Sequence, residues 1–358
     1  MDNKNEMIIH GLVHDIKLSE PTLHVDNESR KRSGHMGHAM VNMGNGKILA
    51  FNSNVSDVRC DGHSGFGWME YRISEDYGES FSEPRDLPYS KQKFYDGVHS
   101  ILVEKAVYCD DGVIVAFGMS NDTLFPVCCD PHGTPSVIRS TDGGETWEEA
   151  YELCSECGRV YDAKYYGGSI YVLEFCNDGK IDFRGVDDEK HLYRIYKSDD
   201  SGKSFYELTV VPFKTTHMRA YGALHFDNNG NLLVYAYNSD NEKEMDYVLS
   251  RDGGRTFSES GTCHLEKRIR NPQIALLNGQ FILHGRDGGA SNAFVFYTSG
   301  DGIHFDEGTL VEPQRFGCCY YSNNVIVNKD GKDRLLVQYS KTYKGCRVNV
   351  MHMWIDTI

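Results

Sequence analysis

Residues able to do chemistry gather at the starts of several expected strands. An arginine fork can hold a carboxylate, a histidine can transfer protons near neutral pH, and a tyrosine hydroxyl can act as a nucleophile. Burying such groups without a purpose is costly. We therefore expect a functional site where these strand starts meet, built from His35, His38, His99, Tyr161, Asp162, His217, Arg219, Arg270, Asn271, Tyr320 and Tyr321.

A short repeated motif indicates the elements that would position these residues. The pattern S-x-D-x-G-x-[ST]-[FW] has four full copies and a shortened fifth, which start at Ser74, Ser140, Ser198, Ser250 and Ser299. Its Asp can accept hydrogen bonds from the backbone of its own turn, and its Gly supplies a positive φ. The closing aromatic residue anchors the hairpin in a core. We therefore expect each motif Asp to be structural rather than catalytic.

The spacing of the motif predicts the fold. The copies recur at intervals of about 50 to 65 residues, which suits a four-stranded propeller blade with long loops. Asn-Gly and Asp-Gly type turns between alternating strands indicate further hairpins. We expect an all-β, six-bladed β-propeller in which blades 1–5 carry the motif. One domain would span 1–358, with residues 315–358 as the last blade and a strand at about 6–13 closing it.

Composition limits the partners of this chain. The formal net charge is −15, and an acidic surface repels nucleic acids and anionic membranes. Residues 1–6 are polar and are not followed by a signal-peptide pattern. The 11 cysteines then suggest reduced thiols in a cytoplasmic protein. We expect neither nucleic acid nor membrane as a partner.

The repeated motif resembles the Asp-box, or BNR repeat, of the sialidase superfamily. This resemblance implies a central site in which arginines hold a substrate carboxylate, a tyrosine is the nucleophile and a loop aspartate is the acid/base. On this sequence it assigns Tyr321 as the nucleophile and Asp61 as the acid/base. It implies a substrate-binding set of Arg219, Arg270 and Arg286, to which we add His217 and Tyr320.

The sequence also departs from ordinary sialidases at the expected active site. Gly37-His38-Ala39-Met40 stands where the family has Arg-Ile-Pro, and Tyr237 stands where it has an arginine. The expected first strand of blade 4, residues 219–226, contains no glutamate to activate a tyrosine. Histidines His38 and His99 are candidate general acid/base groups in this altered site.

These observations predict a carbohydrate-active enzyme, a sialidase-like exo-glycoside hydrolase whose substrate is an acidic oligosaccharide. An alternative is a propeller-type oligouronide lyase that uses His38, His99 or His217 as its base. A third possibility is a sugar-binding propeller without catalysis. Since His35-x-x-His38 is a weak metal motif, we expect no metal and no cofactor.

Overall fold

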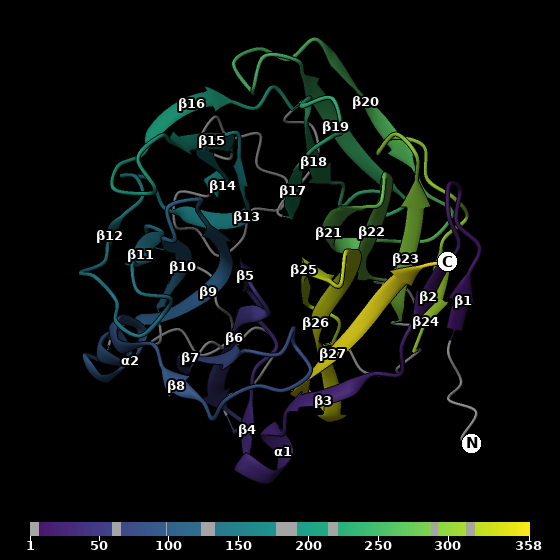
Figure 1. Cartoon of the computed structure of the whole chain (residues 1–358). Coiled ribbons are helices and arrows are strands. Elements are labelled where there is room, and N and C mark those ends of the chain that lie inside the picture. The colour runs from purple at the N-terminus through teal and green to yellow at the C-terminus, as the bar shows by residue number, and fades with distance from the viewer. Residues whose placement is uncertain are drawn as a thin grey trace, which may run out of the picture.

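The chain forms a six-bladed β-propeller in the computed structural model (Figure 1). The structure describes residues 7–58, 66–97, 99–122, 133–176, 192–213, 221–287, 293–312 and 319–358, without the side chains of His99 and Asp122. The fold class expected from the motif spacing is therefore confirmed.

The first three blades follow one another along the chain. Blade 1 contains β4 (Arg32–Ser33), β5 (Met40–Gly44), β6 (Lys47–Ser56), β7 (Gly67–Ser74) and β8 (Arg85–Asp86). Blade 2 contains β9 (His99–Tyr108), β10 (Ile114–Asp122), β11 (Ser136–Ser140) and β12 (Tyr151–Glu152). Blade 3 contains β13 (Gly158–Tyr166), β14 (Ser169–Cys176), β15 (Tyr193–Ser198) and β16 (Tyr206–Val210).

The remaining blades complete the ring. Blade 4 contains β17 (Gly222–Phe226), β18 (Leu232–Tyr237), β19 (Glu244–Ser250) and β20 (Glu259–His264). Blade 5 contains β21 (Arg270–Leu277), β22 (Gln280–Arg286), β23 (Phe294–Ser299) and β24 (Thr309–Val311). Blade 6 is built on β25 (Ser322–Lys329), β26 (Lys332–Lys344) and β27 (Arg347–Thr357).

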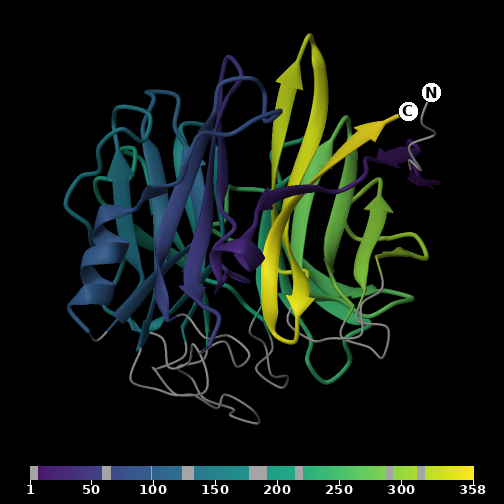
Figure 2. The same cartoon turned by 90° about the horizontal axis from the view of Figure 1, so that it is seen from below.

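The N-terminal segment adds strands to blade 6 and so joins the two ends of the chain. The fourth place in this blade, beside β27, belongs to β2 (Ile16–Leu18). Residues within the strand expected at about 6–13 form β1 (Met7–Ile9), which pairs with the outer side of β2. Another strand, β3 (Thr22–Val25), pairs with the other half of β27 (Figure 2).

Apolar side chains fill the spaces between neighbouring blades. Buried clusters join blades 1 and 2, 2 and 3, 3 and 4, 4 and 5, 5 and 6, and 6 and 1. Between blades 1 and 2, for example, Phe51 and Met69 pack with Leu102 and Ile114, all fully buried. Burying one such side chain is worth about 1.5–3 kcal/mol. These clusters fix the angle between blades and thereby the place where the innermost strands meet.

The motif Asp closes its own turn by hydrogen bonds. In blade 3, Asp200 accepts from the backbone N–H of Lys203 and of Ser204, each at 3.0 Å. The hydroxyls of Ser198 and Ser204 also donate to its carboxylate at 2.8 and 2.6 Å. Burial opposes its ionisation, but these hydrogen bonds lower the pKa of Asp200 below its usual value. The closing aromatic, Phe205, packs on Phe117 of the preceding blade.

Replacing Asp200 by alanine is expected to destabilise the protein by about 1–2 kcal/mol, because several hydrogen bonds in the turn lose their acceptor. Urea unfolding would measure this change. The matched control is Lys203→Ala, at a variable motif position, which keeps the backbone N–H that the turn uses. An equal loss in the two variants would contradict a structural role for the Asp carboxylate.

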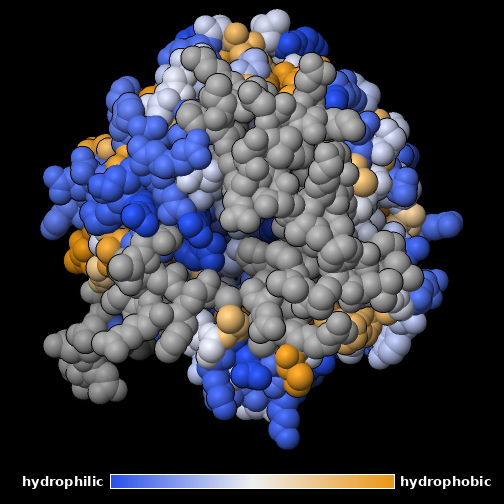
Figure 3. Space-filling model, turned by 180° about the vertical axis from the view of Figure 1, so that it is seen from behind, coloured by the Kyte–Doolittle hydropathy of each residue, from blue (hydrophilic) through white to orange (hydrophobic). Residues whose placement is uncertain are grey.

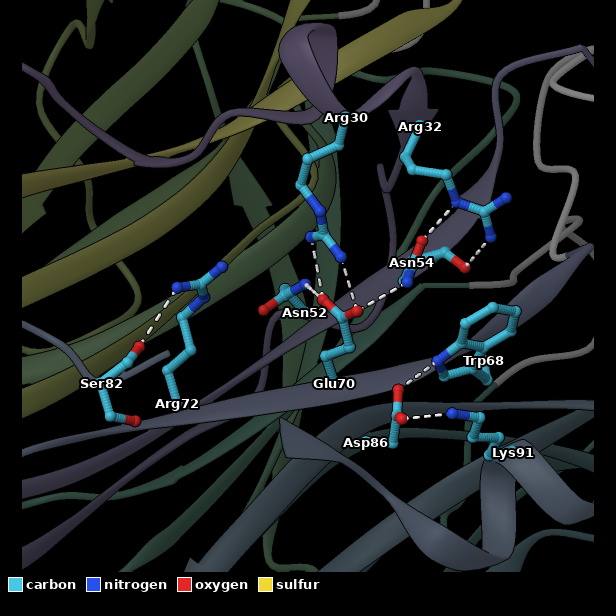
Figure 4. A network of polar contacts seen from close by, with 10 residues as sticks. All are labelled: Arg30, Arg32, Asn52, Asn54, Trp68, Glu70, Arg72, Ser82, Asp86 and Lys91. Carbon is cyan, nitrogen blue, oxygen red and sulfur yellow. Dashed lines mark hydrogen bonds and ion pairs between the residues drawn. The ribbon is translucent and has the colours of Figure 1, made fainter. Parts of the chain in front are cut away.

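The segment between β3 and blade 1 is held by a polar network (Figure 4). The helix α1 (Asn27–Arg30) begins after Asp26, whose side chain accepts from the N–H of Ser29. Arg30 donates to both carboxylate oxygens of Glu70 in β7, at 2.9 and 2.6 Å. Glu70, which is buried, also accepts from Asn54 at 2.6 Å. The bidentate pair satisfies a carboxylate that would be costly to bury alone.

The second helix, α2 (Pro88–Tyr95), packs against blades 1 and 2 and starts with a proline at its first turn. Among the described residues, no helix combines the length and the apolar character that crossing a membrane requires.

Candidate functional site

The innermost strands bring two tyrosines and an arginine together at the centre of the ring. Tyr321 lies immediately before β25, and Tyr221 lies immediately before β17. Their hydroxyl oxygens are 3.0 Å apart. From the end of β22, the guanidinium of Arg286 lies over the Tyr321 ring, 4.9 Å from its centroid, and the ring of His35 contacts Tyr321 edge-on at 5.4 Å.

Burial controls the protonation of this tyrosine. Tyr321 is only 2% exposed. Burial raises its pKa well above the ordinary value, and the opposing charge of Arg286 does not reverse that shift. Its hydroxyl therefore carries its proton at neutral pH. Nucleophilic attack by Tyr321 requires a group that accepts this proton as the new bond forms.

A second arginine lies on the blade 3 side of Tyr321. The buried Arg159 of β13 forms an ion pair with Glu104 of β9 at 3.0 Å, and its guanidinium stacks 5.0 Å from the Tyr161 ring centroid. Burial raises the pKa of Glu104, but Arg159 and the other nearby cations outweigh burial and lower it below its usual value. Glu104 thus stays ionised and neutralises Arg159.

A third arginine is paired with a carboxylate from the loop after β18. Arg270, at the start of β21, donates from Nε to Oε1 of Glu242. The hydroxyl of Tyr237, at the end of β18, donates to the same oxygen at 2.9 Å. Arg270 is the strand partner of Arg286, and the rings of Tyr237 and Tyr221 contact each other at 5.4 Å. Contacts therefore continue from Tyr321 through Tyr221 to this pair.

Beneath these residues, a buried polar cluster joins the innermost strands. Lys105 of β9 lies 3.3 Å from a carboxylate oxygen of Asp162 in β13. The same ammonium donates to Gln273 of β21, and to Asn323 of β25 at 3.0 Å. Four blades therefore contribute to one cluster. It separates the tyrosine site from a pocket of about 250 Å³ lined by the later halves of the inner strands, including Asn42, Lys164, His225 and Asn324.

Two further residues expected in the site differ in their surroundings, since His38 lies close enough to Glu104 for their charges to interact and Tyr320 does not contact the site residues described above. His38 is buried with its Nε2 3.0 Å from the His35 carbonyl, and burial lowers its pKa to about 4. Tyr320 faces away from Tyr321. Its ring packs against those of Phe294 and Tyr339, which also contact each other, and its hydroxyl donates to the backbone carbonyl of Glu312. The substrate-binding expectation for Tyr320 is therefore not supported by its packing.

Of the other expected residues, some lie in this site and the rest lie outside the part of the chain that the structure describes. Tyr321, Arg286 and Arg270 are brought together as described above. Asp61, His217 and Arg219 lie outside the described residues, and so does the side chain of His99, whose backbone begins β9.

Sequence reasoning missed several members of the site. Arg159 precedes the singled-out Tyr161 by two positions, and Tyr221 follows Arg219 by two, so strand periodicity could have indicated both. Glu104 is next to the buried Lys105 and gave no separate signal. Glu242 lies in a hairpin loop, where nothing in the sequence distinguishes it from the other acidic residues of the chain.

The site is suited to holding an anionic or hydroxyl-rich small molecule. Arginine donors, carboxylate acceptors and several aromatic rings from different blades lie close together around Tyr321. Within the described ranges, no three His, Cys, Asp or Glu side chains are placed to hold a metal ion. Figure 3 shows the molecule from behind, where the described surface is mostly hydrophilic.

Comparisons with known proteins support the fold. No family model and no curated protein matches the chain. A crystal structure of a protein of unknown function from Dyadobacter fermentans is 15% identical, with a TM-score of 0.76, and the match covers 96% of this chain and 99% of that one. A Hadza microbial sialidase is 12% identical, with a TM-score of 0.69, and 93% and 68% of the two chains are covered.

A third structure, Trypanosoma rangeli sialidase with the inhibitor DANA, is 12% identical with a TM-score of 0.63. The match covers 90% of this chain and 55% of that one. At such identities the likeness concerns architecture. The chain therefore has a sialidase-like six-bladed propeller fold, and its chemistry must be argued from its own residues.

Proposed function

We propose that this protein is a sialidase-like exo-glycoside hydrolase that acts on an acidic sugar. The observation that carries the proposal is the central Tyr321, hydrogen-bonded to Tyr221 at 3.0 Å and covered by the Arg286 guanidinium. A tyrosine is a suitable nucleophile beside a substrate carboxylate, because its neutral hydroxyl is not repelled by that charge. An imported acidic oligosaccharide in the cytoplasm is the substrate that this proposal assigns.

In this reaction Arg286 binds the sugar carboxylate. The Tyr321 oxygen forms a bond to the anomeric carbon while the glycosidic C–O bond breaks, and water later releases the sugar from the tyrosine. Because burial keeps the Tyr321 proton in place, a base must accept it during attack. The Tyr221 hydroxyl, which is in hydrogen-bond contact, can relay this proton only while it passes its own proton on, and His99 is the proposed final acceptor. Asp61 is our proposed donor to the leaving oxygen.

Replacing Tyr321 by phenylalanine is expected to lower kcat/KM by at least about 10³-fold, because it removes the attacking oxygen. The measurement is release of free acidic sugar from a panel of sialosides and glucuronides. The matched control is Tyr339→Phe, which removes a buried hydroxyl that donates to Glu312 between blades 5 and 6. Thermal melting of the variants would report any loss of folding.

The same assay separates the alternatives. An unsaturated product that absorbs in the ultraviolet, formed without water addition, would instead identify a lyase with a histidine base. Undiminished turnover in Tyr321→Phe would remove this tyrosine from the mechanism. Sugar binding by the wild-type protein without turnover of any glycoside would leave a binding propeller and contradict the hydrolase.

A further inference from the structure

Glu242 is a buried carboxylate with one oxygen in use and one without a partner. Its Oε1 accepts from Tyr237 and Arg270. The residue is only 9% exposed. Its Oε2 is buried and has no hydrogen-bond partner among the described residues. Leaving a carboxylate oxygen desolvated and unpaired is costly, and such an atom in a native structure requires an explanation.

The arginine beside it has the opposite arrangement. Arg270 uses only Nε in the described contacts, and its side chain is 39% exposed. Its two terminal amino groups thus remain available as donors. A carboxylate acceptor and a guanidinium donor therefore lie side by side, next to Tyr237 and within ring contact of Tyr221.

The charges of this pair decide what it can bind. Glu242 neutralises Arg270, and its unpaired oxygen would repel a second carboxylate. A sugar hydroxyl suits the pair better, because it donates one hydrogen bond and accepts another. Hydrogen bonds to charged groups are also stronger than those between neutral groups.

We infer that Glu242, Arg270 and Tyr237 form a subsite for a sugar hydroxyl, in which Glu242 Oε2 accepts from the hydroxyl and Arg270 donates to that oxygen or to its neighbour. This inference rests on the proposed function for the placing of the sugar at Tyr321. It assigns the substrate carboxylate to Arg286 and removes Arg270 from the carboxylate clamp expected from the sequence. The subsite thereby selects sugars by the position of a hydroxyl.

The test is the change Glu242→Gln, which keeps an oxygen for Tyr237 and Arg270 but turns the unpaired acceptor into a donor. Calorimetric titration would use N-acetylneuraminic acid, glucuronic acid and glucose. We expect the variant to bind the acidic sugars about 10- to 100-fold more weakly than the wild-type protein does. If the subsite held a carboxylate instead, removing the negative charge would strengthen binding, and that result would overturn the inference.

Glu244→Gln is the matched control, because this glutamate lies two residues away from Glu242. Its side-chain contacts with Asn238 and His264 are long, 3.5 Å and 3.7 Å, so they contribute little. Thermal melting would verify that the variants fold. A second test measures the affinity of the wild-type protein for monodeoxy glucuronic acids, each of which lacks one hydroxyl. The one that lacks the hydroxyl held by the subsite should bind about 10-fold more weakly than glucuronic acid.

Binding of glucose but not of the acidic sugars would contradict the proposed function and leave the subsite to be decided by Glu242→Gln. Binding of the acidic sugars with full strength in Glu242→Gln would contradict the subsite alone. Absence of binding by all three sugars would overturn the two together.

Discussion

Replacing Asp162 by asparagine is expected to lower the free energy of unfolding by about 3–5 kcal/mol. Lys105 and Asp162 are nearly inaccessible to solvent, with side chains 7% and 2% exposed. Burial lowers the pKa of Lys105, while Asp162 opposes that shift. Without the carboxylate, a buried ammonium loses its counter-charge. The carboxylate also accepts from the backbone N–H of Ala163 and of Leu224, each at 2.9 Å.

Urea unfolding would measure this loss. The matched control is Glu145→Gln, which removes the charge of an exposed partner of Arg85 and should cost less than about 1 kcal/mol. A double variant, Lys105→Met with Asp162→Asn, should recover part of the stability, because the unpaired buried charge is gone. An Asp162→Asn protein as stable as the control would show that this cluster does not hold the inner strands together.

Acidification is expected to unfold the protein steeply below about pH 6. Burial lowers the pKa of His38 and His225 to about 4 and of His284 and His352 to about 3. In the unfolded chain these side chains would titrate near the ordinary value of about 6.5. Between these limits the unfolded state binds more protons, so stability is fully present above about pH 6.5 and is lost as the pH falls.

Each of the four histidines can remove up to about 1.4 kcal/mol per pH unit. Glu174 acts in the opposite direction, since burial raises its pKa to about 7 and a raised carboxyl pKa favours the folded state at lower pH. Together these four histidines and Glu174 are therefore expected to contribute a slope of about 4 kcal/mol per pH unit near pH 5.5. Burial also lowers the pKa of His24 well below its ordinary value, which makes the slope steeper. Urea unfolding in a pH series from 7 to 5 would measure it.

One histidine can be removed from this balance without losing its hydrogen bond. His352 lies 2.8 Å from Oε1 of Gln338, and a glutamine in its place can still donate. We expect His352→Gln to reduce the slope by up to about 1.4 kcal/mol per pH unit. His264→Gln, at an exposed position, controls for the loss of a histidine as such. Equal slopes in the two variants would contradict the role of burial at His352.

The sequence by itself determined the architecture of this protein. Each motif copy specifies its own turn, because residues such as Asp200 and Ser204 bond within a few positions, and local contacts do not depend on the rest of the fold. Five such turns at regular spacing require repeated blades. Tyr321 could also be singled out from the sequence, since it stands at the start of an expected inner strand and the resemblance assigned it as the nucleophile.

The closing strand was less accessible from sequence. A short apolar run at 6–13 is compatible with any edge position in a sheet. In the structure β2 pairs with β27, so β1 is the outermost strand of blade 6 and not the fourth. The same holds for Tyr320 and Tyr321. Both are tyrosines near one strand start, but one fills the space between blades 5 and 6 and the other faces the centre.

Only the tertiary structure decided which charged groups meet. Arg270 is paired with Glu242, 28 positions away in the sequence, and Arg159 with Glu104 from another blade. No local pattern encodes these pairs, because they depend on the angle between blades that the apolar clusters set. The sequence therefore determined the ring and the position of its central tyrosine, while the closure of the ring decided the partners of each arginine and which acceptor was left open.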